Sequence, residues 1–254
     1  MLKYIKYYIP AVTGILFILF FLQGQNYPTF FFISWSLFLI IGDYVSPRDK
    51  DIQQFSYPWI LNYSIYVNLP ILSGLILLVV SIFSNNNPTW YIDGLNSQFN
   101  IDFTQIKESF TLFDKVALIS QTALFVGILG TVPGHELVHR KKSRVDMFIG
   151  NWLLAFSWDC TFAIEHVHGH HKNVCLDEDP ASAKRGENIY LFILRATLQE
   201  QISGWKIESE RLKRRKLNVF SIRNRMIIGY FRSISITIAA FILGGVPGTL
   251  IFLL

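Results

Sequence analysis

Charged residues and cysteines are both scarce in this 254-residue chain. Only 16% of the residues are charged and 51% are hydrophobic, a balance that excludes an ordinary soluble domain. The only two cysteines, Cys160 and Cys175, form no C-x-x-C motif, which excludes a disulfide framework. The sequence has no repeats or low-complexity tracts, and its first apolar run lacks the small-residue cleavage site of a removable signal peptide. Together with its long apolar runs, this composition predicts a polytopic membrane protein.

Five apolar runs predict the membrane-spanning helices. They cover residues 8–22, 30–41, 65–83, 116–132 and 226–243. A turn at 244–248 separates the last run from a sixth, 249–254, that is too short to cross a bilayer. The predicted fold class is an all-α, polytopic transmembrane helical bundle with five complete spans and a truncated sixth. We expect one membrane domain over residues 1–254, with a histidine-rich and interfacial region at 134–216.

The distribution of positive charge predicts the orientation of these helices. Basic residues cluster at Lys3 and Lys6, at Arg48 and Lys50, and at 140–144. All of them fall on one side of the membrane if each of the first four runs crosses. The acidic segment 89–114 then falls on the other side. We therefore expect the N-terminus and the histidine-rich region to be cytoplasmic, and we expect no nucleic-acid partner.

Two further segments are apolar or amphipathic without being predicted as spans. A crossing helix at 147–164 would place the histidines before and after it on opposite faces, about 30 Å apart. We therefore predict a re-entrant or interfacial helix there. The stretch 187–216 predicts an amphipathic helix at the membrane surface. Its expected lipid-facing residues are Phe192, Leu194, Leu198, Ile202 and Trp205.

All six histidines of the chain lie between Gly134 and Asn173. They are His135, His139, His166, His168, His170 and His171. On a helix, the four-residue steps from His135 to His139 and from His166 to His170 place each pair on one face. Imidazole binds iron, zinc, copper and nickel, and one tetrahedral zinc needs only three or four ligands. The number of histidines indicates two metals or a spare residue, and a metal-free polar loop is the alternative. Cys175 follows the second cluster, as a ligand or simply as a reduced thiol.

The two clusters resemble the first two histidine boxes of the integral-membrane alkane hydroxylases. The matching sequence is H-E-L-V-H-R-K, then E-H-V-H-G-H-H-K-N-V, then E-D-P-A-S at 178–182. These enzymes belong to the membrane di-iron superfamily that includes the fatty-acid desaturases. The run R-A-T-L-Q-E…E-S-E-R-L-K-R-R is similar to the family downstream of its second box.

The resemblance implies two non-haem irons and specific roles for several residues. The implied ligands are His135, His139, His166, His170 and His171. His168 stands at a variable position, which implies a supporting role or none. Glu136 and Glu165 are candidates to orient ligand histidines, with plain solvated carboxylates as the alternative. Trp35, in the second apolar run, is a candidate gate at the deep end of a substrate channel; a lipid-facing tryptophan is the alternative.

The resemblance also implies an activity and a location. The expected reaction is hydroxylation of the terminal carbon of medium- to long-chain alkanes, with O2 and electrons from rubredoxin. The expected location is the inner (cytoplasmic) membrane of a bacterium. The family carries further histidine boxes after the return of the sixth helix. We therefore expect this chain to be an N-terminal fragment that is inactive by itself because ligands are missing.

Three other functions remain open from the sequence. A lipid desaturase or another hydroxylase of the same superfamily, acting on a fatty acyl chain, is one. A membrane zinc protease is the second, since H-E-x-x-H is its motif and Glu136 would be its general base. Such an enzyme needs only one more ligand, which leaves the second cluster unexplained. The third is a non-catalytic metal-binding or transport protein.

Overall fold

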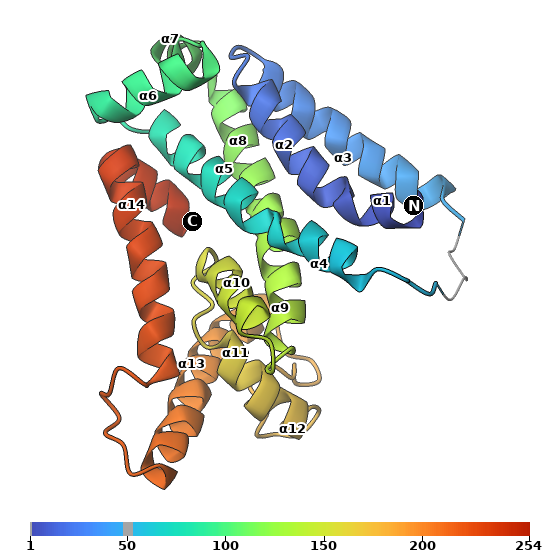
Figure 1. The fold of residues 1–254 in the computed structure, drawn as a ribbon, viewed down its shortest axis with the longest axis vertical. Coiled ribbons are helices and arrows are strands. Elements are labelled where there is room, and N and C mark those ends of the chain that lie inside the picture. Colours follow the sequence, from blue (N-terminus) through green and yellow to red (C-terminus); the bar gives the residue numbers. More distant parts are fainter. Residues whose placement is uncertain (1, 48–52) are drawn as a thin grey trace. The chain divides into compact units, whose positions relative to one another are not determined.

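A computed structural model describes residues 2–47 and 53–254 of the chain (Figure 1). Throughout this part of the chain the regular secondary structure is helical, with no strand, which confirms the predicted all-α class. Arg48 and Lys50, used above for orientation, lie outside the described residues. The chain divides into two compact units, Met1–Gly130 with Thr237–Leu254, and Thr131–Ile236. The second unit contains the predicted region 134–216 and extends beyond it at both ends.

Five helical segments of the described residues are long and apolar enough to cross a membrane. They are Lys3–Phe21, Tyr27–Val45, Pro58–Ile82, Leu112–Val138 and Arg225–Leu253. Each contains or overlaps one of the five predicted runs, so the membrane-spanning character of the chain is confirmed. Many large apolar side chains on these segments are exposed, among them Phe38 and Ile40. Such surfaces suit lipid rather than water.

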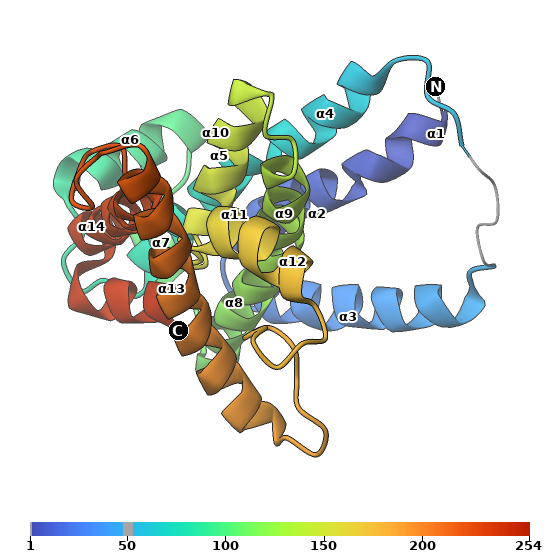
Figure 2. The ribbon, with the colours of Figure 1, turned by 90° about the horizontal axis from the view of Figure 1, so that it is seen from below.

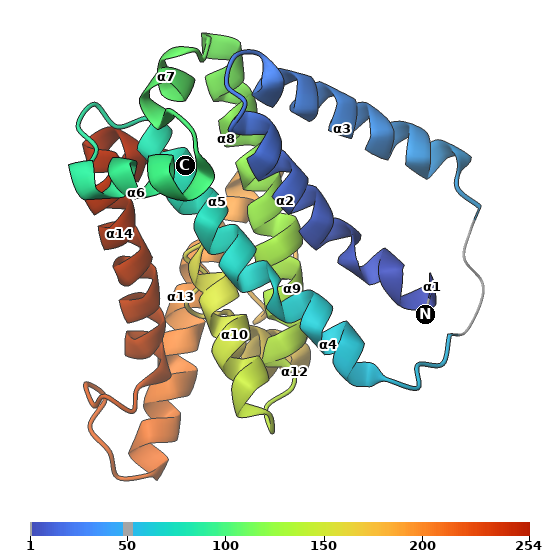
Figure 3. The same ribbon diagram turned by 45° about the horizontal axis from the view of Figure 1, so that its top comes forward.

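The first unit is built around four helices. The chain forms α1 (Leu2–Ile5), a 3₁₀ turn (Lys6–Tyr8), α2 (Ile9–Phe21), α3 (Tyr27–Val45), α4 (Pro58–Tyr66), α5 (Asn68–Ile82) and α8 (Leu112–Phe125). Helices α2, α3, α5 and α8 lie against one another (Figures 1 and 3). Their shared core is aromatic, with the ring of Phe17 5.1 Å from that of Phe31 and 5.6 Å from that of Phe125.

The predicted polar segment 89–114 is mostly helical. It forms α6 (Thr89–Phe99) and α7 (Phe103–Glu108), which lie at one end of this unit (Figure 1). The side chain of Asp102 accepts a hydrogen bond from the backbone N–H of Gln105 and so caps α7. Thr111 and Asp114 form a reciprocal capping box that starts α8. The segment is therefore ordered by local capping and by burial of Phe103, although its composition is polar.

The second unit holds both histidine clusters. Helix α8 continues through a π-helical segment (Val126–Thr131) into α9 (Val132–Val138), and α10 (Arg144–Ala155) follows. After a turn come α11 (Phe162–Glu165), a second π-helical segment (His166–His170) and α12 (His171–Asn173). Figure 2 shows α9 beside α11 and α12. The long helix α13 (Ile189–Arg214) leads to the first half of α14 (Arg225–Leu253).

As predicted, the run 147–164 does not form a membrane-spanning helix. Its helix α10 has 12 residues, fewer than the roughly 20 that a bilayer requires. Gly134 and Gly150 allow α9 and α10 to pack closely, because a Cβ added at Gly150 would lie 2.8 Å from Cβ of Leu137. The chain then turns at Trp158, whose φ is 57°. This hairpin returns the second cluster to the first.

The amphipathic helix predicted at 187–216 corresponds to α13, but part of its expected lipid face was wrong. Leu194, Leu198 and Ile202 are exposed. Trp205 instead stacks on Tyr230 of α14, with ring centroids 6.2 Å apart. Phe192 is half-buried, and its ring lies under the guanidinium of Arg195. Ile189, Tyr190, Leu191 and Ile193 of the same helix are exposed as well, so the exposed apolar surface of α13 differs from the predicted set of residues.

Helix α14 breaks where the turn was predicted at 244–248. Gly245 has a φ of 58° and a ψ of −160°, which is not helical, and Pro247 follows it. The residues after the break belong to the first unit, where Nδ2 of Asn87 donates a hydrogen bond to the carbonyl of Leu243 at 2.9 Å.

Candidate metal centre

The first pair of histidines is presented by α9 and by the residue that follows it. His135 and His139 are four residues apart, and their ring centroids lie 5.0 Å apart on one face of the helix. The second cluster approaches the same face. The Nε2 atom of His166 lies 3.0 Å from Nε2 of His135. The candidate ligand nitrogens of His135, His139 and His166 all lie within 4.8 Å of one another.

The second cluster follows a π-helical geometry, which the four-residue spacing did not predict. The backbone N–H of His171 donates to the carbonyl of His166, five residues earlier. The side chains of His166 and His171 consequently meet, with their Nε2 atoms 3.1 Å apart. His170 stacks beside His166, with ring centroids 5.3 Å apart. Single π turns occur often at functional sites.

The close approach of these ring nitrogens is better satisfied by a bound metal ion than by hydrogen bonds among the rings. A neutral imidazole carries one N–H and one lone pair, so Nε2 of His166 can form only one good hydrogen bond to the two Nε2 atoms that face it. A cation between the nitrogens would be bound by all of their lone pairs. Burial and the neighbouring histidines lower the pKa of His166 to about 4, so its ring is neutral at pH 7, as a ligand must be.

An apolar side chain covers one side of the cluster. The ring of Phe162 stacks on that of His166 at 4.3 Å and an interplanar angle of 17°. It also lies 5.1 Å from the ring of His135. On another side the cluster opens into a hollow of about 670 Å³, which His139 and His171 line together with Arg140, Lys141 and Lys142. The histidines are thus shielded by an aromatic ring and accessible from a basic surface.

A buried carboxylate that the sequence did not single out holds His170. Oδ2 of Asp179 lies 2.9 Å from Nδ1 of His170, and the Asp179 residue is only 2% exposed. Ser182 donates to the same oxygen at 2.5 Å, and the backbone N–H of Ala181 donates to the other at 3.1 Å. Burial raises the pKa of Asp179, but these hydrogen bonds outweigh it and lower the pKa overall. The motif E-D-P-A-S contained this residue, yet its spacing gave no reason to connect it with His170.

The two acidic residues proposed to orient histidines contact other groups. Glu136 is exposed and accepts from Arg140, four residues later, at 3.0 Å. Glu165 is buried and accepts from the hydroxyl of Ser203 at 3.2 Å. A Cβ at Gly169 would lie 2.2 Å from Oε1 of Glu165, so the carboxylate packs directly against the backbone of the π turn and would have to shift if this residue were larger. Neither carboxylate has a hydrogen bond to a histidine among the described contacts.

Two half-buried carboxylates, Asp159 and Glu200, interact electrostatically with Glu165, which precedes the second cluster. Burial, followed by repulsion from Glu200, raises the pKa values of both Asp159 and Glu165 to about 7. The pKa of Glu200 is also raised, first by burial and then by Asp179. Only Glu165 among these was a candidate from the sequence. The other two, Asp159 in the run 147–164 and Glu200 in the stretch 187–216, belong to no motif, and their surroundings depend on packing between segments that the sequence does not show.

The remaining candidates lie apart from the cluster of meeting nitrogens. His168 is exposed overall, and its pKa is lowered by partial desolvation of the ring and by the positive charges of Lys141 and Arg225. Trp35 lies on α3 in the first unit, stacked on Phe31 and on Phe38. Its role in a substrate channel stays a prediction. Cys175 is exposed, whereas Cys160 is buried with its sulfur 3.2 Å from Oγ of Ser233.

Comparison with known proteins finds matches over most of the chain. Residues 116–254, more than half of it, match the family described as fatty acid desaturase. Alkane 1-monooxygenase 1 of Pseudomonas aeruginosa is 35% identical over 113 residues, which are 44% of this chain and 29% of that protein. Alkane 1-monooxygenase 2 of Alcanivorax borkumensis is 31% identical over 150 residues, 58% of this chain and 38% of that protein.

A more distant relative covers more of the sequence. The xylene/toluene monooxygenase hydroxylase component of Pseudomonas putida is 26% identical over 224 residues, 87% of this chain and 54% of that protein. The matched parts are therefore little more than half of this relative and between 29% and 38% of the two alkane monooxygenases.

Proposed function

The chain belongs to the fatty acid desaturase family, and from that premise we propose that it is an iron-dependent alkane hydroxylase. The proposed reaction places a hydroxyl group on the terminal carbon of a medium- to long-chain alkane with O2. The observation that carries this proposal is the meeting of His135, His166 and His171 through Nε2 atoms 3.0 and 3.1 Å apart. The alkane monooxygenases matched at 31–38% identity support the choice of substrate class.

Two non-haem irons would be held by His135, His139, His166, His170 and His171. Bound iron would supply the electron transfer to O2 that no side chain provides. The protein's own part is to keep the imidazoles neutral and oriented. Asp179 accepts a hydrogen bond from Nδ1–H of His170 and thereby leaves the lone pair of Nε2 of that ring for the metal. Phe162 keeps water from one face of His166.

Two alternative functions are less well supported. A zinc protease would use Glu136 as its general base, but this carboxylate is paired with Arg140 at 3.0 Å. It would also leave His170 and His171 without a role. A desaturase of the same family would use the same ligands. Hydroxylation is favoured over desaturation because the curated relatives carry the names of monooxygenases.

The proposed electron donor is rubredoxin or a similar small acidic protein. The hollow beside His139 and His171 is lined by Arg140, Lys141 and Lys142, and complementary charge would steer such a donor toward it. The same basic residues are also what a cytoplasmic membrane surface requires, so they support the proposed orientation in the inner membrane of a bacterium.

Iron content and product identity test this proposal. We expect purified chain to bind iron in a detergent micelle, His166→Ala to lose most of it, and His168→Ala to keep it. The histidine-to-alanine change is the same in both variants, so His168→Ala is the matched control. In the whole protein, supplied with rubredoxin and its reductase, octane should give 1-octanol by gas chromatography. Equal iron loss in the two variants would refute the ligand assignment, and an alkene product would indicate a desaturase.

A further inference from the structure

A second cavity of the Thr131–Ile236 unit lies outside the histidine cluster. Its volume is about 360 Å³, within the range of roughly 300–1,000 Å³ that small-molecule pockets occupy. One wall is a single face of α10, with Arg144, Phe148 and Asn151 at helical spacing. The opposite wall is a single face of α14, formed by Arg225, Ile228 and Arg232. The segment from Cys160 to Ile164 closes the floor.

The walls of this cavity are fixed by contacts behind them. Oγ of Ser233 donates to the carbonyl of Ala155 at 3.0 Å, which ties α14 to the end of α10. At Gly229 a Cβ would lie 2.8 Å from the carbonyl oxygen of Cys160, so the helix and the floor are in close contact. The cavity is therefore a built feature of this unit.

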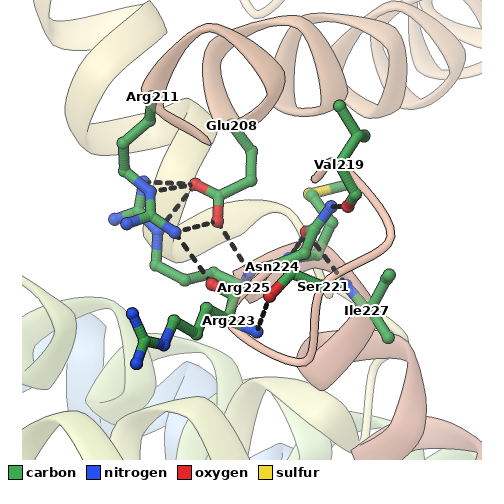
Figure 4. A network of polar contacts seen from close by, with 9 residues as sticks. Glu208, Arg211, Val219, Ser221, Arg223, Asn224, Arg225 and Ile227 are labelled. Carbon is green, nitrogen blue, oxygen red and sulfur yellow. Dashed lines mark hydrogen bonds and ion pairs between the residues drawn. The ribbon is translucent and has the colours of Figure 1, made fainter. Parts of the chain in front are cut away.

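Four cations line the cavity, and none of the described lining residues is acidic. They are Lys141, Arg144, Arg225 and Arg232. Arg225 is held by the buried carboxylate of Glu208, whose Oε2 lies 2.7 Å from the guanidinium (Figure 4). Asn224 caps α14 beside it, accepting from the backbone N–H of Met226 at 2.8 Å. The position of Arg225 is thus set by two polar contacts at the start of the helix.

Arg232 is the least expected of the four cations. It lies seven residues beyond Arg225, about 10 Å further along a segment that is apolar enough to cross a membrane. A charged side chain at such depth is costly unless it faces a partner. The positive-inside rule explains cations at the ends of spans, and it does not explain this one. The aliphatic and aromatic side chains of Met147, Phe148 and Ile228 line the same space.

We propose that this cavity binds the phosphate group of an anionic phospholipid. The cations supply several charge-assisted hydrogen bonds to one phosphodiester, and arginine is suited to phosphate by its planar fork of donors. The apolar wall accepts the start of the acyl chains. Arg232 lies about 10 Å along α14 from Arg225, so the cavity runs from the start of the candidate span into its apolar part and offers surface for both a headgroup and the start of its acyl chains. The proposal rests on α14 spanning the membrane and not on the reaction proposed above.

Calorimetric titration of the detergent-solubilised protein with short-chain lipids tests this site. The titrants are dihexanoyl phosphatidylglycerol, dihexanoyl phosphatidylcholine and sodium phosphate. We expect the anionic lipid to bind at least about tenfold more tightly than the zwitterionic one, because the cations of the cavity prefer a net negative headgroup. Arg232→Gln and Arg144→Gln should each weaken binding of the anionic lipid about tenfold or more, as loss of one charge-assisted hydrogen bond does.

The control variant is Arg215→Gln, which removes an equal charge from an exposed position of the same unit outside the cavity. It should bind the anionic lipid within twofold of the wild type. An equal loss in Arg215→Gln would mean attraction to the whole basic surface and would overturn the proposal. Unchanged binding in Arg144→Gln would overturn it as well. Sodium phosphate binding as tightly as phosphatidylglycerol would show that the cavity takes free phosphate and not a lipid.

Discussion

Replacing Asp179 by asparagine tests whether this carboxylate holds His170 in the orientation that a metal requires. The change keeps the size of the side chain and removes its charge. Oδ2 of Asp179 accepts from both His170 and Ser182, and Oδ1 accepts from the backbone of Ala181. In either orientation of the asparagine amide, an NH2 group replaces one of these oxygens and faces a donor. One or more of the three hydrogen bonds must therefore break.

The size of the effect follows from the burial of this residue. Loss of a partner behind a metal-binding histidine costs about 10–100-fold in metal affinity, or roughly 1.4–2.8 kcal/mol. Asp179 is 2% exposed, so water cannot replace the lost hydrogen bond, and we expect a loss near the upper end of this range. The unpaired donor also destabilises the fold by about 1–3 kcal/mol.

Anaerobic titration of the purified protein with Fe²⁺ measures the change in affinity. The melting temperature of the metal-free protein is followed separately, so that loss of fold is distinguished from loss of binding. The control is Asp177→Asn, which makes the same chemical change at an exposed position two residues away. If Asp179→Asn binds Fe²⁺ within twofold of the wild type, or if Asp177→Asn is equally weakened, the positioning role assigned to Asp179 is wrong.

Three further predictions concern other parts of the chain. Burial raises the pKa of Glu208, but hydrogen bonds from two arginines lower it to about 2, against an ordinary value of 4.5. The stability that the ionised Glu208 contributes is complete above pH 4.5 and is lost as the pH falls toward 2. Glu208→Gln should therefore lower the free energy of unfolding by about 2 kcal/mol at pH 7. This is less than the cost of breaking a fully buried ion pair, because the arginines are partly exposed. Melting curves between pH 7 and 3 should show the two proteins converging in acid, and a constant difference would contradict this. In the whole protein, Trp35→Ser should lengthen the alkanes accepted, as product analysis over C8 to C16 would show, whereas an unchanged profile means no gate. In a background without native cysteines, Ser97→Cys should react with an impermeant thiol reagent only from the outside, and Ser143→Cys only from the inside. Labelling of Ser143→Cys from the outside would show that the predicted topology is wrong.

Much of the fold follows from composition and spacing. The five candidate spans are apolar runs interrupted by polar or glycine-containing turns, and hydropathy alone places them. The meeting of His135 with His166 followed from one geometric condition, that the run between them does not cross the membrane. The 12-residue length of α10 satisfies that condition. The capping signals of Asp102 and of Thr111 with Asp114 were also in the sequence and would have predicted helix starts within the acidic segment 89–114 and directly after it.

Other features depend on contacts between residues distant in sequence. Trp205 packs against α14 because its ring stacks on that of Tyr230, and the periodicity of α13 alone does not predict this contact. Asp179 reaches His170 only because the chain between them turns, with Cys175 at a φ of 65°. The burial that raises the pKa of Asp159 is likewise a property of the packed unit. Residue types in a motif identify the chemistry, but they do not identify which side chains support it.

The π turn at His166–His170 also limits how the chain length can vary at this point. A π turn contains one residue more than an ordinary α-helical turn. In an α-helix, each residue rotates the residues after it by about 100° around the helix axis. Deleting one residue between His166 and His171 would restore an ordinary helix in which the two histidines are four residues apart and still share a face. Inserting one would place them six residues apart and turn His171 away from the nitrogen that it now faces at 3.1 Å. Sequence variants with the same function should therefore tolerate changes of residue type, or loss of the extra residue, far more readily than an insertion.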